Sequence, residues 1–184
     1  MINVVCDNLP MKKTQQVKPE GFKRDESEGH CSELSFRGNF ENKLDAKGRV
    51  SLPSDFRKVL NNHDQHSVVI TNYVSEGSRC LEGFAISSWE DFERKLREKS
   101  RFNAKLQRLE NFYLSRAAEC QIDSAGRILL PKHLREYASI EKEMTFTSSI
   151  HGFRIWDTRV WSLVFAEAEA ALIDNPELFA DIDI

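Results

Sequence analysis

The sequence predicts a mixed, β-dominated fold in which two copies of one module pack together, with α-helices at the periphery. Three observations lead to this fold class: an internal repeat, a tight-turn signal in each copy, and helical spacing of apolar residues outside the repeat. The 184-residue chain is long enough for one mid-sized domain or two small ones. Apolar residues make up 40% and charged residues 30%, which is typical of a globular chain.

The internal repeat relates residues 45–60 (DAKGRVSLPSDFRKVL) to residues 123–138 (DSAGRILLPKHLREYA). Six of the sixteen aligned positions are identical: an Asp, a Gly, a Leu, a Pro and two Arg. A weaker match follows in the same order, between GFAISSWEDF at 83–92 and GFRIWDTRVW at 152–161. This indicates a tandem duplication. A lone copy of roughly forty to fifty residues would have a marginal core, so the two are expected to bury their apolar faces against each other as a pseudo-dimer.

Each copy opens on a tight turn, at 45–48 and at 123–126. Asp favours the first position of a type I turn, where its carboxylate accepts a turn amide, and Gly accepts the positive φ of a three-residue hairpin. The apolar residues on both sides of each turn predict the two strands of a hairpin. Because side chains alternate along a strand, Arg49 is expected to point away from the buried Val50.

After the turn, each copy predicts a short helix and two further strands. Proline ends the preceding strand and suits the start of a helix. Between the strands of the first copy, Gly and Ser indicate a loop. The expected elements are a helix from Pro53, strands at 68–70 and 84–86 with a loop at 75–83, and in the second copy a helix from Pro131 and strands at 144–147 and 153–156.

Helices are also expected outside the repeat, because apolar residues recur there at helical spacing. The segment between the copies predicts a pair of helices with one buried stripe, and Ser87 or Ser88 is a candidate cap for the first. The alternative for this pair is direct reading of DNA, since the segment carries eight basic and six acidic residues. A further helix is expected over 158–173, and its apolar surplus suits packing within the chain or between subunits.

Charge is unevenly distributed, although the formal net charge is only −3. Residues 35–161 carry a net charge of +4, whereas residues 162–184 carry six acidic residues and no basic one. The polar composition of the N-terminal segment predicts a flexible extension over 1–35, and 174–184 are expected to form an acidic tail. The low net charge excludes a uniformly basic, histone-like nucleic-acid binder, but it allows a binder whose positive charge is local.

Several functional classes lack their sequence signals. No apolar stretch approaches the ~20 residues that span a bilayer, and no signal-peptide pattern is found, so no membrane partner is expected. The four cysteines are scattered, as in a reduced cytosolic chain. His63 and His66 have HxxH spacing without a third ligand, so neither a metal site nor a cofactor is expected. Without a phosphate-binding, zinc-protease or serine-hydrolase motif, we expect no catalytic residue and no enzymatic activity.

The repeated segments DxKGRxxxP and DxxGRxLLP lie 78 residues apart and resemble the MraZ family, transcriptional regulators built from two SpoVT-AbrB-type modules. FRG at 36–38, AECQIDSAGRILLP at 118–131 and GFRIW at 152–156 extend the resemblance to most of the chain. It implies a tandem AbrB-like double-split β-barrel pseudo-dimer with interleaved hairpins. The first module, with the connecting helices, is expected at 36–116, and the second, with a C-terminal helix, at 117–173.

The resemblance also implies a function. Members of the family form ring-shaped homo-oligomers and bind short direct repeats upstream of the cell-division and cell-wall gene cluster, which includes their own gene. The expected partners are therefore double-stranded operator DNA and further copies of the chain, in the cytoplasm at the nucleoid. The family's DNA-binding positions correspond to Arg49 and Arg127, and to Lys47 in the first copy alone, because Ala125 stands at that place in the second copy.

The residue types in the repeated turns suit this role. An Arg side chain offers a planar fork of donors that grips a guanine edge or a phosphate. Asp45 and Asp123 are expected to hold the turn or to orient the arginine rather than to touch DNA, because phosphate repels a carboxylate. Gly48 and Gly126 are backbone requirements of the turn.

Two alternatives accompany this interpretation. In the first alternative, the Asp–Arg pairs of the turns are only salt bridges within a hairpin. On the second, the chain is an AbrB-like antitoxin that neutralises a toxin through its acidic tail, or another protein-binding module. Arg57 and Arg135 are expected to cover their own helices rather than to read bases.

Overall fold

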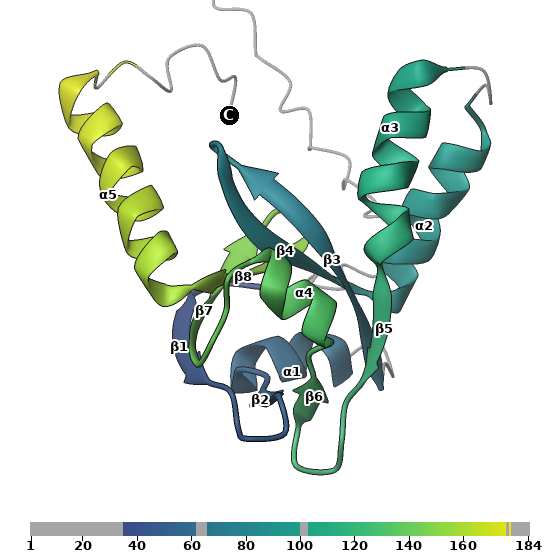
Figure 1. The fold of residues 1–184 in the computed structure, drawn as a ribbon, viewed down its shortest axis with the longest axis horizontal. Helices are drawn as coiled ribbons and strands as arrows, with labels where there is room; N and C mark the ends of the chain where they lie inside the picture. The colour runs from purple at the N-terminus through teal and green to yellow at the C-terminus, as the bar shows by residue number, and fades with distance from the viewer. Residues whose placement is uncertain (1–34, 62–65, 100–102, 176, 178–184) are drawn as a thin grey trace, which may run out of the picture. The chain divides into compact units, whose positions relative to one another are not determined.

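The computed structural model describes residues 35–61, 66–99, 103–175 and 177. Within them, strands form two antiparallel sheets and helices lie around them (Figure 1), which confirms the expected mixture of strands and helices, although the strands do not dominate it. The strands are β1 (Asn39–Lys43), β2 (Arg49–Ser51), β3 (Ser67–Ser75), β4 (Ser78–Ala85), β5 (Ala118–Gln121), β6 (Arg127–Leu129), β7 (Glu143–Ser149) and β8 (Gly152–Asp157). The helices are α1 (Ser54–Asn61), α2 (Ile86–Arg97), α3 (Ala104–Phe112), the 3-10 turn η1 (Leu114–Arg116), α4 (Lys132–Tyr137) and α5 (Thr158–Asp174).

The two copies of the repeat are interleaved. The larger sheet has six strands in the order β1-β7-β8-β4-β3-β5, and the smaller sheet pairs β2 with β6. Strands β1, β3 and β4 of the first copy correspond to β5, β7 and β8 of the second, so the order is the same from either edge. Each copy sends its first strand to the other copy: β1 pairs with β7, and β5 pairs with β3. Each copy therefore completes the sheet of the other.

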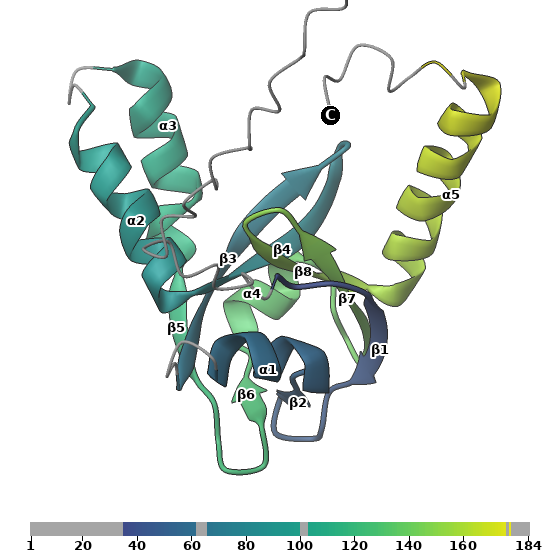
Figure 2. The same cartoon turned by 180° about the vertical axis from the view of Figure 1, so that it is seen from behind.

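The register of both sheets shows a pseudo-two-fold axis. At the centre of the small sheet, Val50 pairs with Ile128, its counterpart in the repeat. At the centre of the large sheet, Glu82 pairs with Arg154. Helix α4 lies toward the viewer in Figure 1 and α1 lies toward the viewer in Figure 2, so the two helices lie on opposite sides of the molecule. The duplication seen in the sequence is therefore a symmetry of the fold.

The weaker sequence match, between 83–92 and 152–161, does not align equivalent positions. The match is offset by 69 residues, whereas α2 and α5 begin 72 residues apart. Its two glycines are instead neighbours across the sheet centre: a Cβ at Gly83 would overlap the Phe153 ring, and a Cβ at Gly152 would overlap the Gly83 carbonyl oxygen. The Gly-Phe dipeptide occurs in both segments because each glycine makes a close contact at the sheet centre. Aligning the two dipeptides therefore shifts the second copy by three residues from its structural counterpart.

The expected hairpins at the two repeated turns are also corrected. The strands on either side of the first turn diverge, because β1 joins the large sheet and β2 the small one. Across the second turn, an isolated β-bridge between Ile122 and Ile128 stands in place of a hairpin ladder. The other copy offers each strand a longer partner, so a pairing that looks local in the sequence is made across the pseudo-dimer.

Two boundaries after the first turn differ from expectation. The loop expected at 75–83 is a tight turn inside the long β3–β4 hairpin, with Glu76 and Gly77 at φ values of 51° and 76°. Gly77 forms this turn between Ser75 at the end of β3 and Ser78 at the start of β4, whereas Gly83 is buried inside β4. Helix α2 begins at Ile86, directly after β4 and without a side-chain cap, so neither Ser87 nor Ser88 caps it.

One apolar core unites both copies. It fills the space between one face of the large sheet and a cover made of β2, β6, α1 and α4. Phe56 is fully buried at its centre, and its ring contacts Phe36, Phe40, Phe146 and Phe153. The other face of the sheet carries α2 and α3 through one aromatic cluster and α5 through another.

Strands β1 and β5 are the edges of the large sheet, so hydrogen bonds among the described residues do not close it into a barrel. The double-split barrel implied by the family resemblance is therefore not visible as a closed ladder. None of the described helices has both the length and the apolar character that a membrane span requires.

The core assignment predicts a large effect of Phe56→Ala. Removing this ring leaves a cavity among four aromatic neighbours and should lower the free energy of unfolding by about 3–5 kcal/mol. Urea unfolding followed by circular dichroism measures the loss. Leu129→Ala is the control, because that side chain is 58% exposed and should change stability by less than about 0.5 kcal/mol. Equal losses for the two variants would contradict the placement of the core.

Candidate nucleic-acid interface

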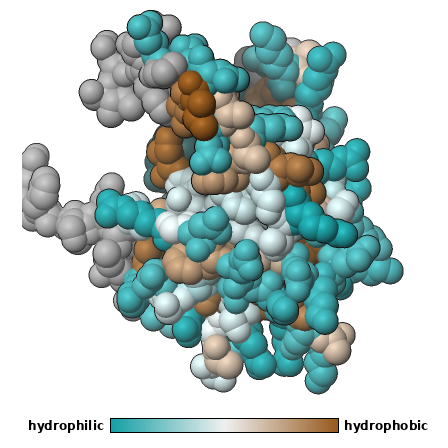
Figure 3. Space-filling model, turned by 90° about the vertical axis from the view of Figure 1, so that its left-hand side faces the viewer, coloured by the Kyte–Doolittle hydropathy of each residue, from teal (hydrophilic) through white to brown (hydrophobic). Residues whose placement is uncertain are grey.

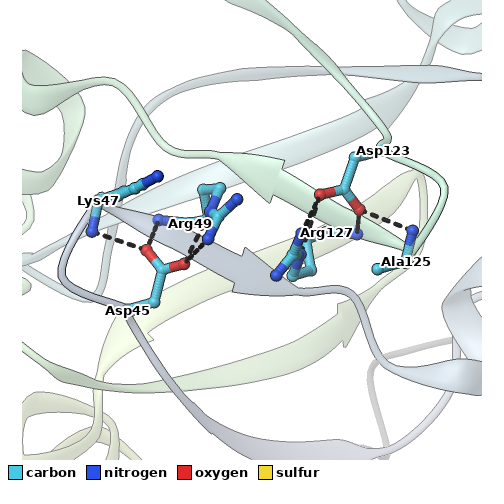
Figure 4. Close-up of polar contacts among 6 residues, drawn as sticks. All are labelled: Asp45, Lys47, Arg49, Asp123, Ala125 and Arg127. Atoms are coloured by element: carbon cyan, nitrogen blue, oxygen red, sulfur yellow. Dashed lines mark hydrogen bonds and ion pairs between the residues drawn. The ribbon is translucent and has the colours of Figure 1, made fainter.

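A single carboxylate organises the first repeated turn (Figure 4). Oδ1 of Asp45 accepts the backbone N–H groups of Lys47 and Arg49 at 2.8 and 2.9 Å. Oδ2 accepts Nε and Nη2 of the Arg49 side chain at 2.7 and 2.6 Å. The N–H of Gly48 donates to the Asp45 carbonyl oxygen at 2.9 Å, and Gly48 adopts the expected positive φ of 79°. One residue thus fixes both the turn and the arginine.

The second turn repeats this arrangement. Oδ1 of Asp123 accepts the backbone N–H groups of Ala125 and Arg127, both at 2.9 Å. Oδ2 accepts Nε and Nη2 of Arg127 at 2.9 and 2.8 Å. Gly126 has a φ of 75°, close to the value of its counterpart. The expected turn geometry, with Asp at the first position and Gly at the fourth, is therefore present in both copies.

The two Asp–Arg pairs are ion pairs, as the first alternative requires, but they do not occupy the whole guanidinium. Each carboxylate grips the edge formed by Nε and Nη2. Within the described residues, Nη1 of Arg49 and Nη1 of Arg127 have no hydrogen-bond partner. About a third of each arginine side chain is exposed, 32% and 35%. The carboxylates therefore orient the arginines and leave one edge of each free to donate.

The small sheet brings the two arginines onto one surface. Val50 and Ile128 are buried at its centre, so the alternating residues of β2 and β6 face outward. Figure 4 shows Arg49 and Arg127 lying between the two carboxylates. We call the outer face of this two-stranded ribbon the β2–β6 face; it consists of Arg49, Ser51, Arg127 and Leu129. A ribbon of two strands fits the major groove of B-DNA, which is ~12 Å wide.

Sequence reasoning missed one residue of this face. Leu129 is 58% exposed, an unusual place for a large apolar side chain in a ribbon that otherwise carries polar groups. The repeat contains a signal for it, because Leu129 aligns with Ser51, which lies two positions after Arg49 and therefore faces the same way on the strand. Lys47 is exposed in its turn, and Ala125 stands in the same place in the second copy.

Hydrogen bonding keeps both aspartates ionised. The backbone N–H of Arg49 and then its side chain lower the pKa of Asp45 to about 2. The Arg127 side chain and then its backbone N–H lower the pKa of Asp123. In return, Asp123 raises the pKa of the Arg127 guanidinium, with a smaller contribution from Asp45. This smallest effect comes from the turn of the other copy.

Two further arginines cross from one copy to the turn of the other. A Cβ at Gly48 would lie 3.1 Å from Nη2 of Arg135, and a Cβ at Gly126 would overlap Nη1 of Arg57. Arg135 also donates from Nε to the Leu130 carbonyl oxygen at 3.0 Å. Each arginine therefore lies against the turn of the opposite copy. The turn glycines leave room for this approach and also adopt a positive φ.

The other candidate groups lie apart from this surface. Among the described residues, no three His, Cys, Asp or Glu side chains form a group that could hold a metal, and His63 lies outside those residues. Cys80 and Cys120 are buried free thiols, and burial raises their pKa values to about 12 and about 11. Both thiols therefore stay protonated at neutral pH and have a packing role.

Comparison with known proteins gives one family for both halves of the chain. Residues 35–112 and 113–181 match the family model described as "MraZ protein, putative antitoxin-like". A relative named "Transcriptional regulator MraZ" from Pseudomonas syringae pv. syringae is 33% identical over 146 residues, covering 79% of this chain and 95% of its own. One of the same name from Photorhabdus laumondii subsp. laumondii is 37% identical over 126 residues, covering 68% and 82%. Another, from Syntrophobacter fumaroxidans, is 36% identical over 126 residues, covering 68% and 81%.

The turn geometry predicts an unusually acidic Asp45. Its carboxyl should titrate near pH 2, below the ~3.9 of an unperturbed Asp. Because the folded-state pKa is lowered, the carboxylate stabilises the turn above the unfolded value, and this contribution is lost as the pH falls from about 4 towards about 2. NMR titration of the side-chain carboxyl carbon measures the pKa. In Arg49→Gln the pKa should rise part of the way back, and titration of the native protein at the ordinary value would contradict the assigned hydrogen bonds.

Proposed function

The chain belongs to the MraZ family, and from this membership we propose that it is a sequence-specific DNA-binding transcriptional regulator. The observation that carries the proposal is the β2–β6 face, where one arginine from each copy is held on a shared surface. The relatives named above are transcriptional regulators and not enzymes. This agrees with a sequence that carries no catalytic motif.

The geometry of the turns supports recognition of a DNA groove. The free edge of each guanidinium can donate to the O6 and N7 acceptors of guanine or to a phosphate. Because the aspartate already holds the arginine in place, less side-chain entropy is lost on binding than with a freely moving arginine. Lys47 adds a cation for a phosphate beside the first turn, and the second turn lacks this cation because Ala125 replaces it.

We propose that the targets are short direct repeats upstream of the cell-division and cell-wall genes, including the gene of the protein itself. The protein then acts in the cytoplasm at the nucleoid. One chain offers few cationic contacts, so a ring of copies that engages several repeats at once supplies the affinity through multivalency. The formal net charge of −3 limits indiscriminate adhesion to DNA.

We also propose that the modules, 36–116 and 117–173, form a double-split β-barrel pseudo-dimer. Support comes from the exchange of first strands between the copies and from the core that both copies share. The β2–β6 ribbon with α1 and α4 covers one face of the large sheet, whose edge strands β1 and β5 are not paired with each other.

An antitoxin-like protein is the second candidate function. The description of the matching family model favours it. It requires a toxin that binds this chain, so copurification of a toxin from the native cells would support this candidate, and its neutralisation by the chain would establish it.

The proposed function predicts that Arg49→Ala combined with Arg127→Ala abolishes operator binding. Each substitution removes the free donor edge on the β2–β6 face while leaving the core intact. A mobility-shift assay with DNA from upstream of the gene measures binding. The control is Arg94→Ala with Arg97→Ala, which removes the same charge from exposed positions on α2 and should keep most of the affinity. Unchanged binding by the first variant would refute the assignment.

Lys47→Ala should act differently from the arginine variants. A lysine that contacts only phosphate contributes affinity without sequence preference, so its loss should weaken binding to operator and random DNA alike. The slope of log affinity against log salt should fall by about 1. Affinity measured at several salt concentrations on both DNAs tests this, and a loss confined to the operator would show that Lys47 reads bases.

A further inference from the structure

The β2–β6 face carries one large apolar side chain, Leu129, and its position distinguishes it from other exposed apolar residues. A single exposed leucine is common on protein surfaces and by itself needs no explanation. Most of the surface visible in Figure 3 is hydrophilic, with hydrophobic residues in scattered patches. Among the described residues, the other large apolar side chains that are exposed belong to α3, to α5 and to the ends of the β3–β4 and β7–β8 hairpins, whereas Leu129 lies beside both arginines of the candidate interface.

The register of the ribbon fixes the neighbours of Leu129. It lies directly opposite Arg49 and two positions after Arg127 on its own strand, so all three side chains share the outer face. Residues directly opposite each other in an antiparallel pair have Cβ atoms ~5 Å apart. The leucine cannot turn inward, because Val50 and Ile128 occupy the buried side of the ribbon.

The two copies of the repeat differ at this position. Ser51 is the counterpart of Leu129, and it lies directly opposite Arg127 as Leu129 lies opposite Arg49. The ribbon therefore does not need an apolar side chain here in order to fold, since a serine stands in the symmetrical environment. Because Leu129 is 58% exposed, most of its surface is free to contact another molecule. Such a contact accounts for the leucine better than a role in the core.

The chemistry of the major groove offers an isobutyl group one suitable partner. Base edges in this groove present hydrogen-bond donors and acceptors, and the C5 methyl group of thymine is the apolar exception. A leucine placed against the polar edges would remove them from water without replacing their hydrogen bonds, which costs free energy. A leucine placed against the methyl group would instead bury apolar surface on both sides, which is favourable.

We propose that Leu129 selects a thymine in the bound DNA by covering its methyl group. The proposal rests on the DNA-binding function proposed above and assigns a base preference to one further residue of the same face. Base pairs are stacked ~3.4 Å apart along the helix axis. Since the Cβ atoms of Leu129 and Arg49 are ~5 Å apart in this pairing, the thymine lies one or two base pairs from the base that Arg49 contacts. Ser51 lacks the apolar surface, so Arg127 has no such neighbour.

Replacement of thymine by uracil tests this contact, because uracil keeps the base pairing and lacks only the methyl group. DNA from upstream of the gene is prepared with either base, and the affinity of each protein variant for both DNAs is measured by mobility shift. The native chain should bind the thymine DNA at least about fourfold more tightly, the effect of burying one methyl group. Leu129→Ala should bind the thymine DNA more weakly than the native chain does and should lose the preference between the two DNAs.

Two comparisons separate this contact from other effects of the substitution. Val74→Ala is the matched control, because this side chain is 46% exposed near the end of the β3–β4 hairpin, and its loss should leave the thymine preference unchanged. The slope of log affinity against log salt should be the same for Leu129→Ala as for the native chain, since the substitution removes no charge.

Three outcomes overturn the proposal. If Leu129→Ala keeps the full preference for thymine DNA, the methyl group acts through the shape of the DNA and not through this side chain. If the native chain binds both DNAs equally, no thymine methyl group is read, while the test of Arg49 and Arg127 still decides the proposed function. A native chain that binds neither DNA would refute the proposed function together with this contact. If circular dichroism shows Leu129→Ala unfolded, Leu129→Ser, which copies the counterpart Ser51, replaces it with the same expectation.

Discussion

The ladder between β2 and β6 is the interaction on which the rest of the structure depends. It extends beyond the two strands through a reciprocal pair of bonds: the N–H of Leu52 donates to the Gly126 carbonyl oxygen, and the N–H of Leu130 to that of Gly48, both at 3.0 Å. These bonds tie each turn to the strand end of the other copy. The ladder buries its central side chains and turns its arginines outward, so one short ribbon joins the copies, seals the core and presents the candidate interface.

Within each turn, the aspartate serves folding and the site together. One oxygen of its carboxylate satisfies backbone donors, and the other holds the guanidinium. Removal of the carboxylate would therefore disturb the turn and free the arginine at once. The side chains of Arg57 and Arg135, which come from the opposite copy, lie close to the turn glycines. The site is consequently a product of both modules.

The sequence predicted the features that local chemistry determines. Asp and Gly placed the two turns, alternation placed Val50 inside and Arg49 outside, and helical spacing found α5 within a residue at each end. It could not predict strand partners, because the alternation of apolar residues is satisfied equally by a local hairpin and by exchange between copies. The displaced glycine match failed for a similar reason: Gly83 and Gly152 are small because they approach each other, a constraint that only the register reveals. Leu129 was missed because apolar residues are expected inside.

The symmetry of the β2–β6 face is incomplete, and under the proposed function this has a consequence for how the protein would lie on DNA. In the second copy, Ala125 stands at the position equivalent to Lys47, and Leu129 stands at the position equivalent to Ser51. A ribbon with perfect two-fold symmetry would present the same surface after half a turn, and its natural target would be a palindrome. Here Lys47 and Leu129 lie at the same end of the ribbon, where Leu129 pairs with Arg49, whereas Ser51 pairs with Arg127 at the other end, so the surface has a polarity. On the DNA-binding role proposed above, a surface with this polarity would distinguish the two directions along the double helix, and its sites would share one orientation.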